Sequence, residues 1–320
     1  MSAMKEIRTV DAVGQVLCHD ITQIVRGVTK NARFRKGHVI QEEDVPVLLS
    51  LGKDHIYVWD EDATEMHENE AADVLRELCQ NEHMTATAPK EGKIELIADC
   101  DGVFQVDEDR FDAVNELEDV TIATLAQNMP VKKGMKLAGM RVTPLFIARE
   151  KMEEVRRTAG TEPLLRLLPY RKDLKVGVVT TGTEVFLGRI EDTFTPVIAA
   201  KLKKFGLTND VTEHTKAAIE ELLDLGMDII LCTGGMSVDP DDRTPAAIRD
   251  AGVDIVTYGA PVLPGAMFLL GYSVREGREV TVMGLPGCVM FDKATVFDMI
   301  LPRAIAGDRV TRKEIRHFGI

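Results

Sequence analysis

The pattern of apolar and polar positions changes near residue 173. Beyond that residue, short runs rich in β-branched residues and ending in glycine alternate with segments whose apolar positions recur at helical spacing. The strand-like runs are KVGVVTTG, DIILCTGG, VDIVTYG and REVTVMGLPG, and the helical segments are PVIAAKLKKFG, AAIEELLDLG and PAAIRDAG. This alternation predicts an α/β fold over residues 173–320, a three-layer α/β/α domain with a mostly parallel sheet.

The N-terminal half has shorter and more varied patterns. Over residues 1–60, a segment with near-helical apolar spacing precedes the strand-like run DHIYVW, which predicts a small mixed α/β module. Residues 61–145 begin with an acidic helical pattern and continue with GKIELIA, DGVFQVD and VTIATLA, so we expect an acidic helix plus a β-rich module. Residues 146–172 are predicted to form a connecting helix, interrupted at Gly160, and a linker.

The charge of the chain limits the kinds of partner. Its 320 residues include 52 acidic and 39 basic side chains, a net charge of −13, which argues against binding nucleic acid through a broad basic surface. The acidic excess lies in residues 54–119, where 21 acidic residues stand against 4 basic ones. That segment carries −17, so the rest of the chain carries the difference, a net +4, and does not repel anionic ligands.

The sequence gives no sign of export or of a resident metal held by cysteine or histidine. No apolar run reaches the length of a membrane span, and residues 1–10 lack the apolar core of a secretory signal. The five cysteines are widely spaced without a CxxC pair, and the seven histidines show no metal-ligand spacing. We therefore expect a cytoplasmic protein with no membrane partner.

In a largely parallel sheet, ligands bind beyond the carboxyl ends of the strands, so the loops after the strand-like runs are the places to look for chemistry. The first loop contains Thr181, Gly182 and Thr183, small residues that let backbone N–H groups approach a phosphate closely. Glu184 and Asp192 in the same loop are candidates for holding a divalent cation. The alternative is that Glu184 is a solvated acid and Gly182 an ordinary turn glycine.

The second loop follows DIIL and combines a Gly-Gly pair with hydroxyl and acidic side chains. Its candidates are Thr233, Gly234, Gly235, Ser237, Asp239, Asp242 and Thr244. Glycines and hydroxyls at a strand end, followed by acids and a Thr-Pro helix start, predict a cradle for an anion and a metal ion. The alternative is that Asp242 and Thr244 only cap the helix, although neighbouring acids repel one another unless a cation or a basic partner is present.

The third and fourth loops each place Pro-Gly after a strand. They contain Pro264 with Gly265 and Pro286 with Gly287, and we expect both to line the same rim as the first two loops. Taken singly, each Pro-Gly pair is also what an ordinary turn requires. Cys288 is expected to be a buried, small apolar side chain, with a reactive thiol at a helix start as the alternative.

Together and in this order, the four loops resemble the molybdopterin-binding fold. That fold is shared by the molybdopterin adenylyltransferases, the molybdopterin molybdenumtransferases and a related family of nucleotide pyrophosphatases and amidases. The resemblance covers residues 173–307 and lies in TGTEVFLGRIEDT, CTGGMSVDPDDRTP, PVLPGAM and GLPGCVM. The Ser of the second segment is typical of the molybdenumtransferases, whereas its DDRTP tail is closer to the adenylyltransferases and pyrophosphatases.

The resemblance implies roles for particular residues. Gly234, Gly235 and Ser237 would hold the terminal phosphate of molybdopterin or the phosphate of AMP, while Glu184, Asp239 and Asp242 would be catalytic. Glu184 and Asp242 would also hold Mg²⁺. The other residues implied in cofactor binding are Thr181, Gly182, Thr183, Thr233, Thr244, Pro264, Gly265, Pro286 and Gly287.

Three departures separate this chain from the molybdenumtransferases. Phe194 stands where the family has Asn, Ala266 replaces a Lys, and Cys288 with Val289 replaces Asn-Pro. The Lys would place a positive charge on an oxyanion rim, where it favours molybdate. The N-terminal half also lacks the family's Ser-Ala-Met-Asp-Gly-Tyr segment.

Three functions therefore stay open. The first is an enzyme of molybdenum cofactor biosynthesis, a transferase that uses Mg²⁺ to transfer molybdate or an adenylyl group from ATP. The second is a non-catalytic carrier of molybdopterin that serves a molybdenum enzyme and docks through its acidic half. The third is a nucleotide pyrophosphatase. The resemblance also makes a homo-oligomer an expectation.

Overall fold

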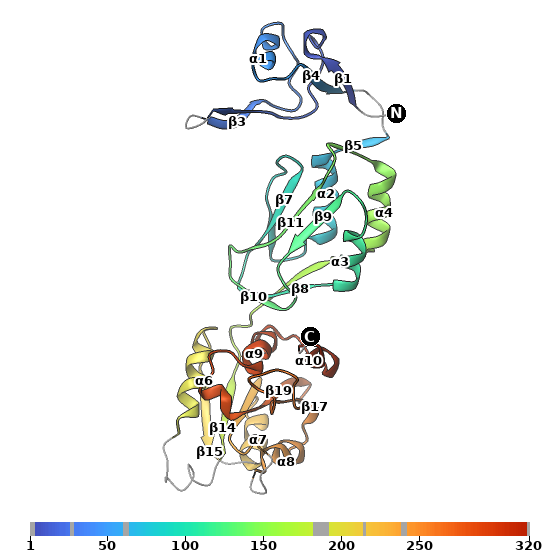
Figure 1. Cartoon of the computed structure of the whole chain (residues 1–320). Helices are drawn as coiled ribbons and strands as arrows, with labels where there is room; N and C mark the ends of the chain where they lie inside the picture. The colour runs from blue at the N-terminus through green and yellow to red at the C-terminus, as the bar shows by residue number, and fades with distance from the viewer. Residues whose placement is uncertain are drawn as a thin grey trace. The chain divides into compact units, whose positions relative to one another are not determined.

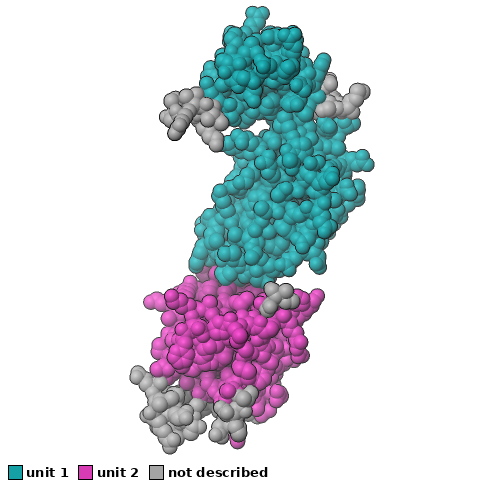
Figure 2. All heavy atoms as spheres, viewed as in Figure 1, with its two compact units in different colours: residues 1–167 teal, residues 168–320 magenta. Residues whose placement is uncertain are grey.

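The computed structural model describes residues 4–25, 29–59, 64–181, 192–213, 216–237 and 242–318. The chain forms two compact units, residues 1–167 and residues 168–320, coloured separately in Figure 2. Within the described ranges, no helix combines the length and the apolar character that crossing a membrane requires.

The beginning of the first unit is built from two small antiparallel pairs of strands. β1 (Met4–Arg8) pairs with β4 (His55–Trp59), and β2 (Ile21–Val25) pairs with β3 (Thr29–Phe34). Helix α1 (Asp44–Ser50) provides Leu48, which is fully buried among the side chains of the strands. The mixed α/β character predicted for this part of the chain is therefore present.

The remainder of the first unit packs helices against antiparallel sheets (Figure 1). Helix α2 (Glu68–Cys79) turns one face inward, because its small and apolar residues recur at helical spacing while its acids face outward. The four-stranded sheet runs β6 (Met84–Ala86), β7 (Lys93–Ala98), β11 (Lys136–Val142), β9 (Val120–Thr124). The smaller sheets contain β10 (Met129–Val131), β8 (Gly102–Val106) and β13 (Leu165–Pro169), and β12 (Phe146–Ala148) with β5 (Glu65–His67).

Two further helices complete this unit. They are α3 (Glu108–Asn115) and α4 (Arg149–Ala159), and α4 ends at Gly160, where the backbone adopts a positive φ. Met152 and Val155 of α4 are fully buried in the same core as α2. Residues 146–167 thus pack into the first unit, whereas the module boundaries at residues 60, 145 and 172 remain predictions.

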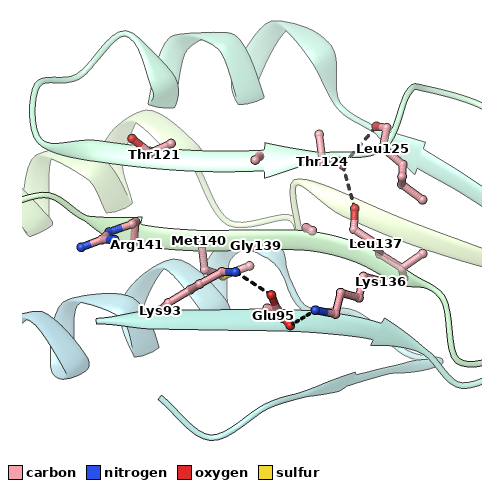
Figure 3. A pocket seen from close by; sticks show the side chains of 12 residues that line it. Lys93, Glu95, Thr121, Thr124, Leu125, Lys136, Leu137, Gly139, Met140 and Arg141 are labelled. Carbon is pink, nitrogen blue, oxygen red and sulfur yellow. Dashed lines mark hydrogen bonds and ion pairs between the residues drawn. The ribbon is translucent and has the colours of Figure 1, made fainter. Parts of the chain in front are cut away.

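The outer face of the four-stranded sheet has a shallow hollow of about 370 Å³ over β7, β11 and β9 (Figure 3). On β7, Glu95 forms ion pairs with Lys93 at 2.6 Å and with Lys136 of β11 at 2.8 Å. The hydrogen bonds from these two lysines lower the pKa of Glu95 to about 2. The two lysines thus share one carboxylate, and Arg141 is a further positive charge in the lining of the hollow.

In the described residues of the second unit, six strands form one sheet in the order β15 (Asn209–Glu213), β14 (Val176–Thr180), β16 (Ile229–Thr233), β19 (Arg278–Leu285), β18 (Leu269–Arg275), β17 (Asp254–Tyr258). The first four strands pair in parallel. β18 runs antiparallel to both β19 and β17. The α/β class is as predicted, but the expected mostly parallel sheet is a mixed one.

A hairpin causes this difference. β18 and β19 are joined by a two-residue turn at Glu276 and Gly277, which both have positive φ, as a tight hairpin turn requires. Glu-Gly is not one of the usual hairpin dipeptides, so the sequence pattern predicted no hairpin at this place.

Helices cover both faces of this sheet. Alternate strand residues face α6 (Phe194–Lys203) and α9 (Val296–Ala306) on one side, and α7 (Lys216–Asp224) and α8 (Thr244–Asp250) on the other. A hydrophobic core lies on each face. Leu231 of β16, for example, is buried in the core on the α6 and α9 side, and Cys232 in the core on the α7 and α8 side, because successive side chains of a strand point to opposite faces. The C-terminal α10 (Arg312–His317) packs Ile315 into the first of these cores.

Candidate functional site

The register of the sheet brings the predicted loops to one edge. Thr180, Thr233 and Leu285 are in register where β14, β16 and β19 end. One residue earlier, Gly284 of β19 is in register with Leu269 at the start of β18, and Leu269 pairs with Tyr258 at the end of β17. The segments after β14, β16 and β19 and the connection from β17 to β18 therefore all begin at the same edge.

The turn of the second loop is held by a cluster of threonines. Thr181 Oγ1 donates to the carbonyl of Thr233 at 2.7 Å and lies 2.9 Å from Thr244 Oγ1, which itself donates to the carbonyl of Gly234 at 2.9 Å. Thr244 thus ties the start of α8 to the Gly-Gly turn and provides no side-chain cap for its helix. The capping alternative for Thr244 is wrong, because its hydroxyl is used by the loop.

The two glycines are required by the backbone of this turn. Gly234 has φ +78° and Gly235 has φ +55°, a region that residues with side chains rarely adopt. A Cβ on Gly234 would lie 2.2 Å from the carbonyl oxygen of Thr181, and one on Gly235 would lie 2.7 Å from Thr244 Oγ1. The backbone of the loop after β16 therefore lies directly against the loop after β14.

Polar groups at this turn are left over for a ligand. Within the described ranges, the backbone N–H groups of Gly234 and Gly235 donate to no protein acceptor. The side chain of Thr233 is fully buried, and its Oγ1 has no hydrogen-bonding partner among the described residues. Free N–H groups beside two glycines are the donors that bind a phosphate, so the turn fits the phosphate of a pterin or a nucleotide.

Asp242 lies at the same loop. Its Oδ2 accepts a hydrogen bond from the backbone N–H of Ser237 at 2.9 Å, across the segment 238–241, which lies outside the described residues. Asp242 therefore closes the loop and does not cap α8, which contradicts the capping alternative. Its second oxygen has no described partner and is the one that fits a metal ion.

Tyr258, which the sequence analysis did not select, also contacts this loop. Its hydroxyl donates to the carbonyl of Met236 at 2.9 Å, and burial together with the charge of Asp242 raises the pKa of the phenol. Tyr258 is the last residue of β17, and only the antiparallel return of β18 brings β17 to this edge. A tyrosine before the glycine of VDIVTYG is the only signal in the sequence.

Asp192 has a structural role in the described conformation. Its Oδ1 accepts the backbone N–H groups of Phe194 at 2.8 Å and Thr195 at 3.1 Å, and its Oδ2 accepts the hydroxyls of Thr180 and Thr195. Burial disfavours the charged carboxylate, but these hydrogen bonds outweigh it and lower the pKa of Asp192. Asp192 thus holds the start of α6 at the end of β14, and both its oxygens are occupied.

The Pro-Gly loops line the edge through backbone packing. The carbonyl of Pro264 accepts from the backbone N–H of Val296 at 3.3 Å, and a Cβ on Gly265 would lie 2.6 Å from the Val296 side chain. Pro286 and Gly287 follow β19, and Gly287 begins a short 3-10 turn. Burial, followed by the charge of Asp292, raises the pKa of Cys288, which disfavours a reactive thiolate.

The structure places Thr181, Thr233, Gly234, Gly235 and Thr244 in contact at this edge, where the two Pro-Gly loops also begin, and the binding and catalytic roles of all these residues remain predictions. Gly182, Thr183, Glu184 and Asp239 lie outside the described residues. Within the described ranges, no group of three or more His, Cys, Asp or Glu side chains has the arrangement of a metal site. The predicted pair of Glu184 and Asp242 therefore remains a prediction.

Comparison with known proteins identifies the C-terminal domain. Residues 177–306 match the family described as "Probable molybdopterin binding domain", as the four loops predicted, and residues 6–60 match one described as "Domain of unknown function (DUF8806)". A molybdopterin molybdenumtransferase of Synechococcus elongatus is 22% identical over 228 residues, which cover 64% of this chain and 55% of that protein.

Two further proteins resemble parts of the chain. A CinA-like protein of Mycobacterium avium is 33% identical over 90 residues, 26% of this chain and 21% of that protein. The chain therefore spans about half the length of the molybdenumtransferase and about a fifth of the CinA-like protein. The crystal structure of the tungsten cofactor synthesizing protein MoaB from Pyrococcus furiosus is 23% identical, with a TM-score of 0.31, over 37% of this chain and 85% of that one.

Proposed function

We propose that the second unit binds molybdopterin or its adenylate at the edge of its sheet and transfers molybdate or an adenylyl group with Mg²⁺. The observation that carries this proposal is the Gly-Gly turn at the edge of the sheet, whose two backbone N–H groups donate to no acceptor among the described residues. It is supported by the membership of residues 177–306 in a molybdopterin-binding family.

The residues of the edge divide into binding and reacting groups. The N–H groups of Gly234 and Gly235 donate to the terminal phosphate, and the threonine cluster fixes the turn that presents them. Such preformed donors stabilise negative charge without rearranging during the reaction. The reaction therefore depends on alignment and on charge, and no covalent nucleophile is required.

The acidic side chains hold the metal ion in this proposal. Asp242 contributes its free oxygen and Glu184 a second carboxylate, and Asp239 helps to position the transferred group. Mg²⁺, when bound, would neutralise the charge that develops on that group. Ser237 completes the loop through its backbone N–H, which keeps the Asp242 carboxylate directed at the edge.

Binding without transfer is the second candidate, because Ala266 leaves the Pro-Gly rim without the lysine of the molybdenumtransferases. Mass spectrometry of the protein with molybdopterin, ATP and Mg²⁺, and in a second reaction with adenylated molybdopterin, Mg²⁺ and molybdate, separates the two. We expect adenylated pterin in the first reaction or molybdate-dependent release of AMP in the second. In the variant Asp242→Asn either product should fall at least tenfold, and the exposed Asp250→Asn of α8 is the control.

Tight binding of molybdopterin with neither product would refute the transfer reaction and support the carrier. Unchanged turnover in Asp242→Asn would remove that acid from the reaction.

A further inference from the structure

The first unit contains a polar cleft that the proposed function does not use. It encloses about 830 Å³ and is lined by side chains from β3, from the start of α2 and from the connection between β6 and β7. Its charged and imidazole-bearing residues are His19, Asp20, Arg35, Lys36, His67, Glu68, Lys90 and Glu91. We propose that this cleft is a binding site for a small molecule that carries an oxyanion, and that Lys36 and His67 bind the oxyanion.

The protonation of His67 follows from its contacts. His67 is the N-cap residue of α2, and its Nδ1 accepts the backbone N–H of Asn69 at 3.1 Å. Burial, followed by the charge of Lys36, lowers the pKa of His67 to about 4, so the ring is neutral at pH 7. A neutral ring whose Nδ1 is an acceptor carries its proton on Nε2. Nε2 is therefore a donor.

This donor lacks an acceptor among the described residues. The His67 side chain is only 2% exposed, and its Nε2 has no acceptor in good hydrogen-bonding geometry, although a backbone contact with Cys18 raises the pKa of the ring and so favours a proton on it. A buried N–H without a well-placed acceptor is destabilising. An acceptor atom bound in the cleft would pair with this N–H.

Lys36 adds a positive charge at the same place. Its Nζ lies 5.1 Å from the centre of the Trp59 ring, and that ring lies 6.5 Å from the ring of His67, centre to centre. Within the described ranges Lys36 forms no ion pair, and burial lowers its pKa, which outweighs the opposing charges of Glu70, Glu68 and Asp20. A half-buried ammonium that is not in contact with a carboxylate can still attract an anion.

The helix start favours an anion as well. α2 has 12 residues, and the backbone N–H groups of its first turn carry the positive end of the helix dipole. Of the carboxylates that line the cleft, Asp20 accepts the backbone N–H of Lys36 at 2.7 Å, and burial raises the pKa of Glu68. The imidazole, the ammonium and the helix start thus form the attractive side of the cleft.

Inorganic phosphate and acetate are the probes that test this site in the full chain. With the histidine rings labelled with ¹⁵N, the Nε2–H resonance of His67 is followed at pH 7.5 and constant ionic strength, with chloride as the reference anion. We expect a saturable shift with phosphate or acetate and none with chloride. Because the resonance reports on the first unit alone, binding of phosphate to the second unit does not interfere.

The variant Lys36→Met should weaken the saturable binding at least tenfold, while Lys133→Met, an exposed lysine elsewhere in the first unit, should not change it. Saturation by phosphate alone would indicate a phosphate ester as the ligand, and saturation by acetate alone a carboxylate. A shift that grows linearly and equally with all three anions would overturn the proposal, as would equal affinity in Lys36→Met and the wild type.

Discussion

Replacing Gly234 by alanine tests whether the backbone of the Gly-Gly turn forms the phosphate cradle. The change has two effects, and a control separates them. Alanine at φ +78° costs about 1–2 kcal/mol of stability because of the left-handed backbone. Gly206→Ala carries the same cost at φ +75°, but a Cβ there meets nothing within 4 Å. The difference between the two variants therefore reports the clash alone.

The size of the clash sets the expected loss of binding. The new Cβ would lie 2.2 Å from the carbonyl oxygen of Thr181, whereas real Cβ contacts do not fall below 3.0 Å. The backbone must therefore move by about 1 Å, a displacement that costs on the order of a hundredfold in a preorganised site. A Cβ on Gly235 would meet the rotatable hydroxyl of Thr244 at 2.7 Å, so Gly235→Ala should show a smaller loss.

The assay is a titration of each folded variant with molybdopterin, with unfolding by urea measured in parallel. We expect Gly206→Ala to lose stability but keep the wild-type Kd, Gly235→Ala to bind more weakly, and Gly234→Ala to bind most weakly. If Gly234→Ala binds as tightly as Gly206→Ala, the turn is not the phosphate cradle and the reasoning is refuted. If Gly234→Ala does not fold, the comparison of Gly235→Ala with Gly206→Ala decides.

Three further perturbations have defined outcomes. Tyr258→Phe removes the hydrogen bond to Met236, so we expect several-fold weaker binding of molybdopterin with little change in melting temperature; a wild-type Kd would mean that Tyr258 does not position the loop. Asp192→Asn should lower the free energy of unfolding by about 1 kcal/mol at pH 7. Because the pKa of Asp192 is lowered in the folded protein, the difference in stability between variant and wild type should vanish as the pH falls below that pKa. A difference that stays constant with pH would contradict a stabilising role of the charged carboxylate. His67 is buried as a neutral ring with its pKa lowered to about 4, so the protein should lose stability as the pH falls from 6.5 towards 4. In urea unfolding, His67→Asn should lose about 2 kcal/mol less stability than the wild type between pH 7 and pH 5. An equal loss in both proteins would contradict the burial of His67 as a neutral ring.

The strand-end loops of the second unit could be predicted from the sequence because each follows a short apolar run and carries its own turn residues. β14 and β16 end at Thr180 and Thr233, directly before the loops selected for phosphate binding. The molybdopterin-binding family of this region was confirmed for the same reason, since four local motifs in a fixed order identify it.

The rest depends on contacts between residues far apart in the sequence. The antiparallel return of β18 brings Tyr258 to the edge, and no local pattern shows which strand becomes its neighbour. Asp192 is a candidate metal ligand in the sequence, yet its oxygens are occupied by N–H groups and hydroxyls that surround it only after folding. The cleft around His67 is likewise lined by segments that are far apart in the sequence, so no local pattern predicts that they meet.

The central claim is that the second unit binds molybdopterin through the phosphate at the Gly-Gly turn. Native mass spectrometry of the wild type and of Gly234→Ala, each titrated with molybdopterin in the presence of Mg²⁺, tests it most directly. We expect one molybdopterin per chain in the wild type and a loss of this complex in Gly234→Ala, with Gly206→Ala unaffected. Absence of a complex with the wild type, or equal occupancy in all three proteins, would contradict it.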